Sequence, residues 1–292
     1  MLSFRYHAIS LVAVLVALVV GVLLGVAIGD AGLVSSAEQN LRADLREDVG
    51  RAEDRAADLE SRLGEQRRQA RRYADASYPL LVGGRLENAR IGLLFLGSPS
   101  REIRDEVAAA LEPSGGKLTG TLSVREPPDV AALAGAADGT RYAALEDDPE
   151  LLDDYGRRIG IQLVQGGRLL RASSGELFSR RAGKLGPFDA VVVARRPPEG
   201  QTDGQAEQTK ALEDGLMRGL TGSAASVVGV EPAASTPSQV PWYRDRDLSA
   251  VDNIDSVAGH GAMVFALSGA SGAFGTGPLA EGLLPAVEDV GG

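Results

Sequence analysis

The strongest pattern in the chain is one uninterrupted apolar run near its start. From Ala8 to Gly29 there is no charged residue, and a run of about 22 residues is long enough to cross a hydrocarbon core of ~30 Å as a helix. Arg5 and His7 precede the run, and Asp30 follows it. Because positive residues flank the cytoplasmic end of membrane helices, we expect a cytoplasmic leader over residues 1–7, a transmembrane helix over 8–29, and the rest of the chain outside the cytoplasm.

The alternative is a cleaved signal peptide, since Ala27-Ile28-Gly29 offers the small residues of a cleavage site. Secretory apolar cores are usually shorter, about 7 to 15 residues. The sequence therefore favours an uncleaved single-pass anchor in the lipid bilayer of the cell membrane.

Small residues recur along one face of this helix. Every fourth position is alanine or glycine, at Ala13, Ala17, Gly21, Gly25 and Gly29. Such a face lets a second helix backbone approach closely, which predicts self-association through Gly21, Gly25 and Gly29. The alternative is that small residues are simply common in membrane helices.

Residues 30–77 form a long, highly charged segment without proline. Its apolar stripe advances in alternating steps of three and four residues, as a coiled-coil seam requires; it runs through Val49, Ala52, Ala56, Leu59, Leu63, Gln66, Ala70 and Tyr73. We predict a coiled-coil stalk of about 60 Å that forms a homodimer, with Leu59 and Leu63 in the seam. The alternative is a single helix packed on its own globular domain.

Four arginines crowd the far end of this segment: Arg67, Arg68, Arg71 and Arg72. Cations suit the negative end of a helix dipole, and this explanation needs no partner. The alternative is a docking site for an acidic protein or an anionic envelope polymer. Tyr78-Pro79 and Gly83-Gly84 then predict a break in the helix and a hinge over residues 78–88.

Beyond the hinge, short apolar runs alternate with helical patterns separated by glycine and proline. Buried strands are expected at residues 89–96, 117–124, 188–194, 225–230 and 261–267, with helices at 101–111 and over about fifteen residues before Leu220. Strands alternating with helices predict a mostly parallel sheet covered on both faces. The fold class is therefore α/β, a Rossmann-like sandwich over residues 89–282 with a flexible tail at 283–292.

Signatures of nucleotide binding and catalysis are weak. The loop Gly97-Ser98-Pro99-Ser100 lacks the spaced glycines of a dinucleotide site, and the glycine-rich stretch 268–277 has no following lysine. A histidine-based triad would have to rest on His260. An acidic cluster around Asp148 is explained as the start of a helix with Asp148 as its N-cap. A second cluster, Asp245–Asp255, has no spacing typical of a hard-cation loop. We expect no enzyme activity.

Composition narrows the partners. The net charge of −10 argues against nucleic-acid binding, which needs surplus lysine and arginine. The chain has no cysteine, two histidines and three methionines, whereas copper(I) prefers thiolate and thioether ligands and copper(II) prefers imidazole. No metal or cofactor is therefore expected from the residues themselves. His260 and Met263 are a nearby pair, and in a strand they would point to opposite faces.

Several motifs together resemble the actinobacterial copper transporter family, the MctB-like proteins. The opening Arg5-x-His7-Ala8-x-Ser10-Leu11-x-Ala13-Val14 carries the resemblance, together with Gly21-x-x-x-Gly25, the charged coil, the stretch from Gly84 to Leu96, Ser249–Asp255 and Phe274-Gly275-Thr276-Gly277. The resemblance implies an envelope protein that lowers intracellular copper, with copper as its cargo. It also implies, from corynebacterial SteB-like relatives, a partner of a second membrane protein in cell separation.

A dimerising anchor, a stalk and a non-catalytic α/β domain favour a scaffold that meets a membrane or envelope protein at a fixed height. Copper efflux or homeostasis is the alternative from the resemblance. A third is an anion or nucleotide sensor that uses the α/β domain.

Overall fold

The computed structural model describes residues 4–30, 33–148 and 150–286. Contacts divide the chain into two units, Met1–Ala70 and Arg71–Gly292, and each is described by itself. The second unit is called the head below. The predicted leader over residues 1–7 lies partly outside the described residues, as does the end of the predicted tail.

Two helices open the chain, α1 (Phe4–Asp30) and α2 (Leu33–Val82). Within α1, Tyr6–Ile28 is long and apolar enough to cross a membrane, and it is the one such helix among the described residues. The predicted apolar N-terminal helix is thus confirmed. The long polar helix is also present as α2, whereas its pairing with a second copy remains a prediction.

The predicted helix break at Tyr78-Pro79 is wrong, because α2 continues through Pro79 to Val82. Proline removes one intrahelical hydrogen bond, but the last turns are held by the head. Val82 is fully buried, and the Tyr78 hydroxyl donates to the carbonyl of Ala110 at 2.6 Å. The helix ends at Val82, directly before Gly83-Gly84, as the sequence predicts for these two glycines, and the Gly83 N–H donates to the Pro79 carbonyl at 3.0 Å. Burial of this end outweighs the lost bond.

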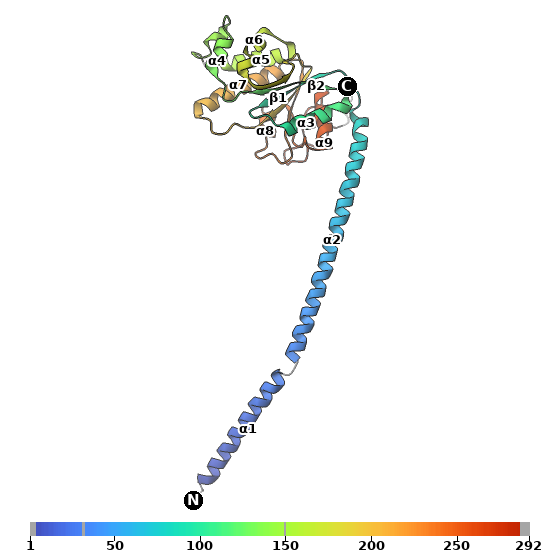
Figure 1. Ribbon diagram of the computed structural model, residues 1–292, viewed down its shortest axis with the longest axis vertical. Coiled ribbons are helices and arrows are strands. Elements are labelled where there is room, and N and C mark those ends of the chain that lie inside the picture. Colours follow the sequence, from blue (N-terminus) through green and yellow to red (C-terminus); the bar gives the residue numbers. More distant parts are fainter. Residues whose placement is uncertain (1–3, 31–32, 149, 287–292) are drawn as a thin grey trace. The chain divides into compact units, whose positions relative to one another are not determined.

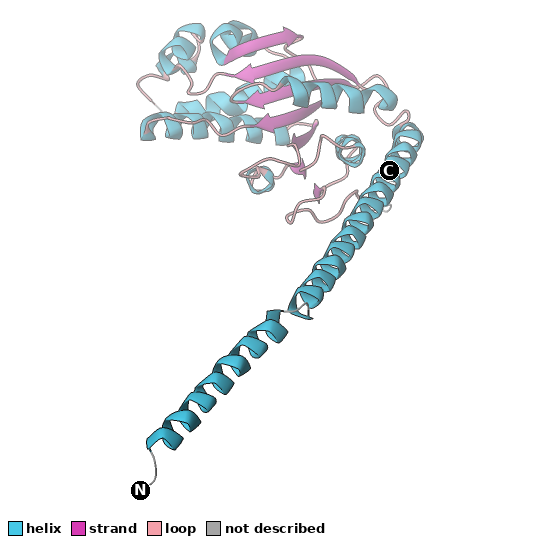
Figure 2. Cartoon of the chain, turned by 60° about the horizontal axis from the view of Figure 1, so that its bottom comes forward, coloured by secondary structure: helices cyan, strands magenta, loops and turns pink. Residues whose placement is uncertain are grey.

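The head is built on a seven-stranded sheet with the order β3-β2-β1-β4-β5-β6-β7 (Figure 2). All neighbouring strands are parallel except β2 and β3, which confirms the α/β class and the mostly parallel sheet. The strands are β1 (Arg90–Leu96), β2 (Lys117–Val124), β3 (Phe178–Gly183), β4 (Ala190–Arg195), β5 (Ser226–Val230), β6 (Ser249–Val251) and β7 (Ala273–Phe274).

Side chains alternate across this sheet and feed two cores. Leu94 and Leu96 of β1 enter one core, and Leu93 and Phe95 enter the other. Figure 1 shows the helices of the two faces. The first face is covered by α4 (Val130–Ala136), α5 (Leu151–Gln165), α6 (Arg168–Leu177) and α7 (Asp203–Thr221), with η2 (Arg141–Ala144) and α8 (Val240–Arg244). The second is covered by α3 (Arg101–Leu111), η1 (Glu112–Ser114), α9 (Val257–Leu267) and the end of α2.

The predicted strand at residues 261–267 is wrong, because these residues belong to α9. A short, continuous apolar run does not distinguish a strand from a buried helix. Here the Ser256 hydroxyl caps the helix by accepting from the Gly259 N–H at 3.0 Å. Met263 and Val264 are both fully buried, so α9 is apolar on more than one side and shows no helical stripe.

The predicted N-cap at Asp148 is also wrong. Helix α5 begins at Leu151 with Glu150 as its N-cap. The Asp148 side chain instead accepts from the Glu150 N–H at 3.1 Å. Asp148 lies two residues before the N-cap of α5. Pro149 lies outside the described residues.

Candidate functional site

The chain changes direction across the sheet between β1 and β4. β2 lies on one side of β1, while β5, β6 and β7 follow β4 on the other side. In open parallel sheets, the two loops that leave such neighbouring strands diverge and form a crevice at the carboxyl ends of the strands. Leu96 and Arg195 are paired in register at these ends. The crevice above them is the candidate functional site.

Two adjoining grooves follow this crevice, with volumes of ≈ 330 Å³ and ≈ 610 Å³. Arg195 lines the first groove and Glu126 lines the second. Three residues from the loops after β1 and β4 line both: Ser98, Arg196 and Pro197. The shared wall makes one continuous polar surface with both positive and negative groups.

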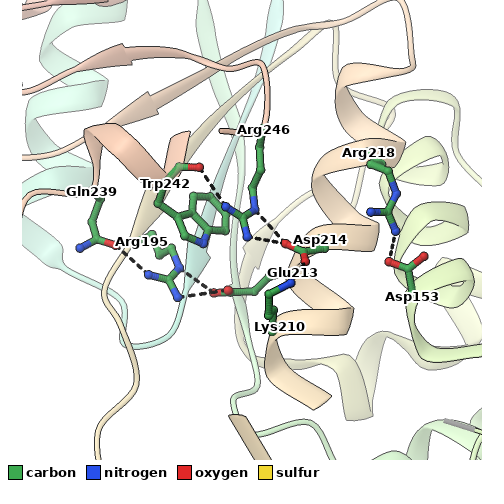
Figure 3. A network of polar contacts seen from close by, with 9 residues as sticks. All are labelled: Asp153, Arg195, Lys210, Glu213, Asp214, Arg218, Gln239, Trp242 and Arg246. Atoms are coloured by element: carbon green, nitrogen blue, oxygen red, sulfur yellow. Dashed lines mark hydrogen bonds and ion pairs between the residues drawn. The ribbon is translucent and has the colours of Figure 1, made fainter. Parts of the chain in front are cut away.

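Arg195, the last residue of β4, is the centre of the polar network (Figure 3). Its guanidinium holds Glu213 of α7 through two hydrogen bonds, from Nε at 2.9 Å and from Nη2 at 3.1 Å. Its Nη1 donates to Gln239 at 2.7 Å. Only 14% of the Arg195 side chain and 2% of the Glu213 side chain are exposed. This bidentate, buried pair fixes α7 to the carboxyl end of β4.

Trp242 lies between two guanidinium groups (Figure 3). The guanidinium carbon (Cζ) of Arg195 is 4.7 Å from the centroid of the tryptophan ring, and that of Arg246 is 4.0 Å from it. Arg246 in turn contacts Asp214 of α7, and Lys210 donates to Asp214 at 2.6 Å. Cation–π contacts of this kind are most favourable with tryptophan. The cluster joins α8 and the turn after it to α7.

The hydroxyl of Tyr243 ties the ends of two strands together. It accepts from the Arg195 N–H at 2.9 Å and donates to the Val230 carbonyl at 3.1 Å. The ring stands against Gly229, where a Cβ would collide with it. The tyrosine is fully buried, and burial raises its pKa. It is therefore a neutral structural bridge between β4 and β5.

Glu126, two residues beyond β2, brings a second carboxyl group to this network. Both of its carboxyl oxygens are buried, and neither has a hydrogen-bond partner in the described structure. Burial, followed by the negative charge of Glu213, raises the pKa of Glu126 to about 9, although Arg195 opposes this shift. Burial also raises the pKa of Glu213. Glu126 therefore holds a proton at neutral pH and is the uncharged carboxyl group of this network.

The second acidic cluster of the sequence serves the loops rather than a cation. Asp252 accepts from the N–H groups of Thr276 and Gly277 at 2.8 and 2.9 Å. Asp255 accepts from the Ala233 N–H at 2.9 Å. Carboxylates that accept from backbone N–H groups in this way order the turns around them.

The self-association residues of the sequence prediction lie in the two long helices. No atom lies within 4 Å of a Cβ built on Gly21 or Gly25, and the surroundings of Gly29 lie outside what the structure describes. Leu59 and Leu63 are 59% and 50% exposed. These positions are open on the single chain, as an interface between copies requires.

The arginine cluster of α2 is also exposed. Arg67, Arg68, Arg71 and Arg72 have no ion-pair partner among the described residues. The dipole explanation is wrong, because α2 continues to Val82 and has no basic residue in its last turn, where the dipole acts. Docking of an acidic partner stays a prediction.

Copper donors do not gather in the described part of the chain. His260 Nε2 is 2.8 Å from a carboxylate oxygen of Glu106 and its ring contacts Tyr78. Met217 and Met263 are buried in two different cores. His260 and Met263 lie three residues apart on α9 rather than on opposite faces of a strand. Over residues 4–30, 33–148 and 150–286, no group of three His, Asp or Glu side chains has the arrangement of a metal site.

Sequence reasoning missed the crevice network. Its signals were present, since Glu126 follows one buried strand, Arg195 ends another, and the carboxyl ends of parallel strands meet at one edge. The pairing of β1 with both β2 and β4 could not be read from the chain, so their proximity could not be predicted.

Taken together, these features define an α/β protein that carries one membrane-length apolar helix at its N-terminus. The chain matches the family described as "Copper transport outer membrane protein, MctB" over residues 1–285. It belongs to that family, which confirms the resemblance found in the sequence. No curated protein matches the chain.

Proposed function

We propose that this protein is a non-enzymatic, membrane-anchored scaffold of the cell envelope that self-associates through α2 and presents the head to a second membrane or envelope protein. The N-terminus lies in the cytoplasm and the head outside it in this proposal. The observation that carries it is the exposed apolar stripe along α2.

The stripe is made of large apolar side chains that are exposed to water on the single chain. Leu41, Leu45, Val49, Leu59 and Leu63 are each 50% to 59% exposed. The rest of α2 is densely charged. A polar helix with a single apolar seam at alternating steps of three and four is stabilised by a second helix.

The same spacing continues beyond Tyr73 to Ser77 and Leu80. Tyr73 is 76% exposed and Leu80 is 86% exposed. Tyr78 and Val82, by contrast, are buried in the core of the head. The last turns of α2 thus have two faces, one packed in the head and one free, and the free face extends the seam.

The charged groups of the crevice support a non-catalytic head. The guanidinium of Arg195 donates hydrogen bonds to both Glu213 and Gln239. These polar groups therefore hold the fold together. The nearest histidine, His260, pairs with Glu106 on the other face of the sheet. A general base must take up a proton, and Glu126, the carboxyl group of the groove without a hydrogen-bond partner among the described residues, already holds one at neutral pH because burial raises its pKa to about 9.

Single cysteines test the seam directly, because the chain contains no cysteine of its own. We expect Leu59→Cys in the full-length protein, in detergent, to form a disulfide-linked dimer on mild oxidation. Ser61→Cys, on the outward side of the same helix, is the matched control and stays monomeric on a reducing-agent-free gel. Equal cross-linking at both positions, or at neither, contradicts a parallel, in-register seam.

A second candidate function, copper efflux or homeostasis, is favoured by membership of a family described as copper transport proteins. Copper would then be the cargo. Met217 and Met263 are buried in the cores, which leaves the imidazole of His260, with a side chain 12% exposed, as the copper donor to test among the described residues of the head. Titration of the full-length protein with copper(I) and copper(II) against a chromogenic chelator distinguishes the candidates. Stoichiometric tight binding that is lost in His260→Ala supports the copper function, and no binding supports the scaffold.

A further inference from the structure

A second hollow lies beside the crevice, on the sheet face that carries α3. Its volume is ≈ 690 Å³, within the usual range for ligand sites, and it opens between α3 and the edge strand β3. The residues around it are Phe95, Pro99, Ser100, Arg101, Arg104, Thr121, Ser123, Arg180, Arg181 and Ala182. Four of these ten are arginines, in a chain whose net charge is −10.

The pairing of β2 with β3 shows which side chains face the hollow. Arg180 lies opposite Ser123 and Ala182 lies opposite Thr121, and directly opposed residues of two strands point to the same side of the sheet. Leu122 points to the other side, into the core beneath α5 and α7. Thr121, Ser123 and Arg180 therefore form the floor and one wall of the hollow.

Helix α3 supplies the opposite wall. Arg101 and Arg104 are three residues apart and so lie on one side of the helix. The Ser100 hydroxyl accepts from the Ile103 N–H at 3.2 Å, so the N–H groups of Arg101 and Glu102 are the ones of the first turn that remain without an intrahelical acceptor. Glu102, the acidic residue of that turn, lines the neighbouring crevice rather than this hollow.

Among the described residues of the head, a carboxylate compensates the positive charge of the hollow at Arg104 but not at Arg101 or Arg180. Arg101 and Arg180 have no carboxylate within ion-pair distance in the part of the chain that the structure describes. Arg104 pairs with its exposed neighbour Asp105 at 2.6 Å. Arg181 points away and donates to Ser174 of α6 at 2.8 Å. Arginines from two separate elements, α3 and β3, thus line one polar floor, and Arg101 and Arg180 have no carboxylate partner among the described residues.

We propose that this hollow binds a phosphoryl group. Guanidinium groups match phosphate oxygens in a planar, two-pronged geometry, the Thr121 hydroxyl adds a donor, and the N-terminus of α3 adds a favourable field. Small phosphate compounds and a phosphodiester polymer of the envelope share this chemistry. The inference rests on the head alone and does not depend on self-association through α2.

Isothermal titration calorimetry of the full-length protein in detergent, with phosphate compounds as probes, tests the site. The probes are inorganic pyrophosphate and a poly(glycerol phosphate) chain. We expect saturable binding of at least one probe, weakened about ten-fold in Arg101→Gln and in Arg180→Gln, since each change removes a charge-assisted hydrogen bond. Pyrophosphate binding indicates a small ligand, and binding of the polymer alone indicates an envelope polymer.

Arg181→Gln is the matched control, because it removes the same charge from the same strand on the opposite face. Its affinity should stay within about two-fold of the parent value. Circular dichroism melts of all three variants check that the head remains folded. Saturation by neither probe, or an equal loss of affinity in Arg181→Gln, overturns the proposal.

Discussion

Gly156 of α5 lies so close to Leu212 of α7 that a Cβ on the glycine would come 2.6 Å from the Leu212 carbonyl oxygen. One turn further along, Gly160 stands in the same way against Leu216. Gly215 and Gly219 of α7 face the backbone of α5 in return. Two glycine pairs, each spaced by four residues, therefore let these two helices pack backbone to backbone on the sheet.

We expect Gly160→Val to force α5 away from α7. The added side chain has no free space, and overpacking of this kind lowers the free energy of unfolding by about 2 to 4 kcal/mol. Gly175→Ala in α6 is the control, because no atom lies within 4 Å of a Cβ there. Alanine at that exposed position should stabilise its helix by up to about 1 kcal/mol. Urea denaturation of both variants measures the difference, and equal stability would contradict the close crossing.

The proton on Glu126 makes stability depend on pH. Its pKa is raised to about 9 in the folded protein and lies near 4.3 in an unfolded chain. Between these values the unfolded state binds fewer protons, so the free energy of unfolding falls as pH rises, by at most about 1.4 kcal/mol per pH unit. Glu126→Gln should remove this penalty, raise the melting temperature at pH 8, and change it little at pH 4.

Glu199→Gln is the matched control, because the exposed Glu199 lines the same groove. It should leave the slope of melting temperature against pH unchanged. A slope that survives in Glu126→Gln would show that another group carries the pH dependence.

Removal of one partner from the buried Arg195–Glu213 pair should be costly. Arg195→Met leaves Glu213 and Glu126 as two buried carboxyl groups without a cation, and breaking such a pair costs about 3 to 5 kcal/mol. The double variant Arg195→Met/Glu213→Leu removes both charges and should recover part of that loss. Denaturant titration at pH 7 compares the two, and a double variant less stable than Arg195→Met alone would argue against the pairing.

Leu80 offers a test of how far the seam extends. If the free face of α2 continues the stripe, Leu80→Glu places a charge at the interface and should weaken self-association about ten-fold or more. Leu279→Glu, at a 49% exposed leucine outside α2, is the control. Sedimentation equilibrium of the full-length protein in detergent measures both. Unchanged association in Leu80→Glu would place the end of the seam before Tyr78.

The regular part of the head was predictable because local pattern and tertiary structure agree there. The runs at 89–96, 117–124, 188–194 and 225–230 correspond to β1, β2, β4 and β5, and the helix expected at 101–111 is α3. Residues 261–267 were misassigned because a helix buried on several sides loses its stripe. The short strands β6 and β7 carry too few residues to show a period.

The close packing of α5 against α7 through glycines could not be predicted from the sequence either. Spacing by four residues was recognised in the membrane helix, where it predicts self-association through Gly21 and Gly25. Gly156 with Gly160, and Gly215 with Gly219, have the same spacing. This spacing alone does not show that α5 and α7 are neighbours, because the sheet brings the two helices together. The network around Arg195 was unpredictable for that reason as well.

The edge strand β3 has a consequence for solubility. It pairs with β2 on one side only, and from Ser179 to Gly183 its residues are exposed. A free strand edge is a template on which other chains can add and aggregate. Arg180 and Arg181 place one positive charge on each face of this edge, where an identical strand would meet like charge. Two heads that met edge to edge would bring these like charges together, which disfavours the joining of their sheets.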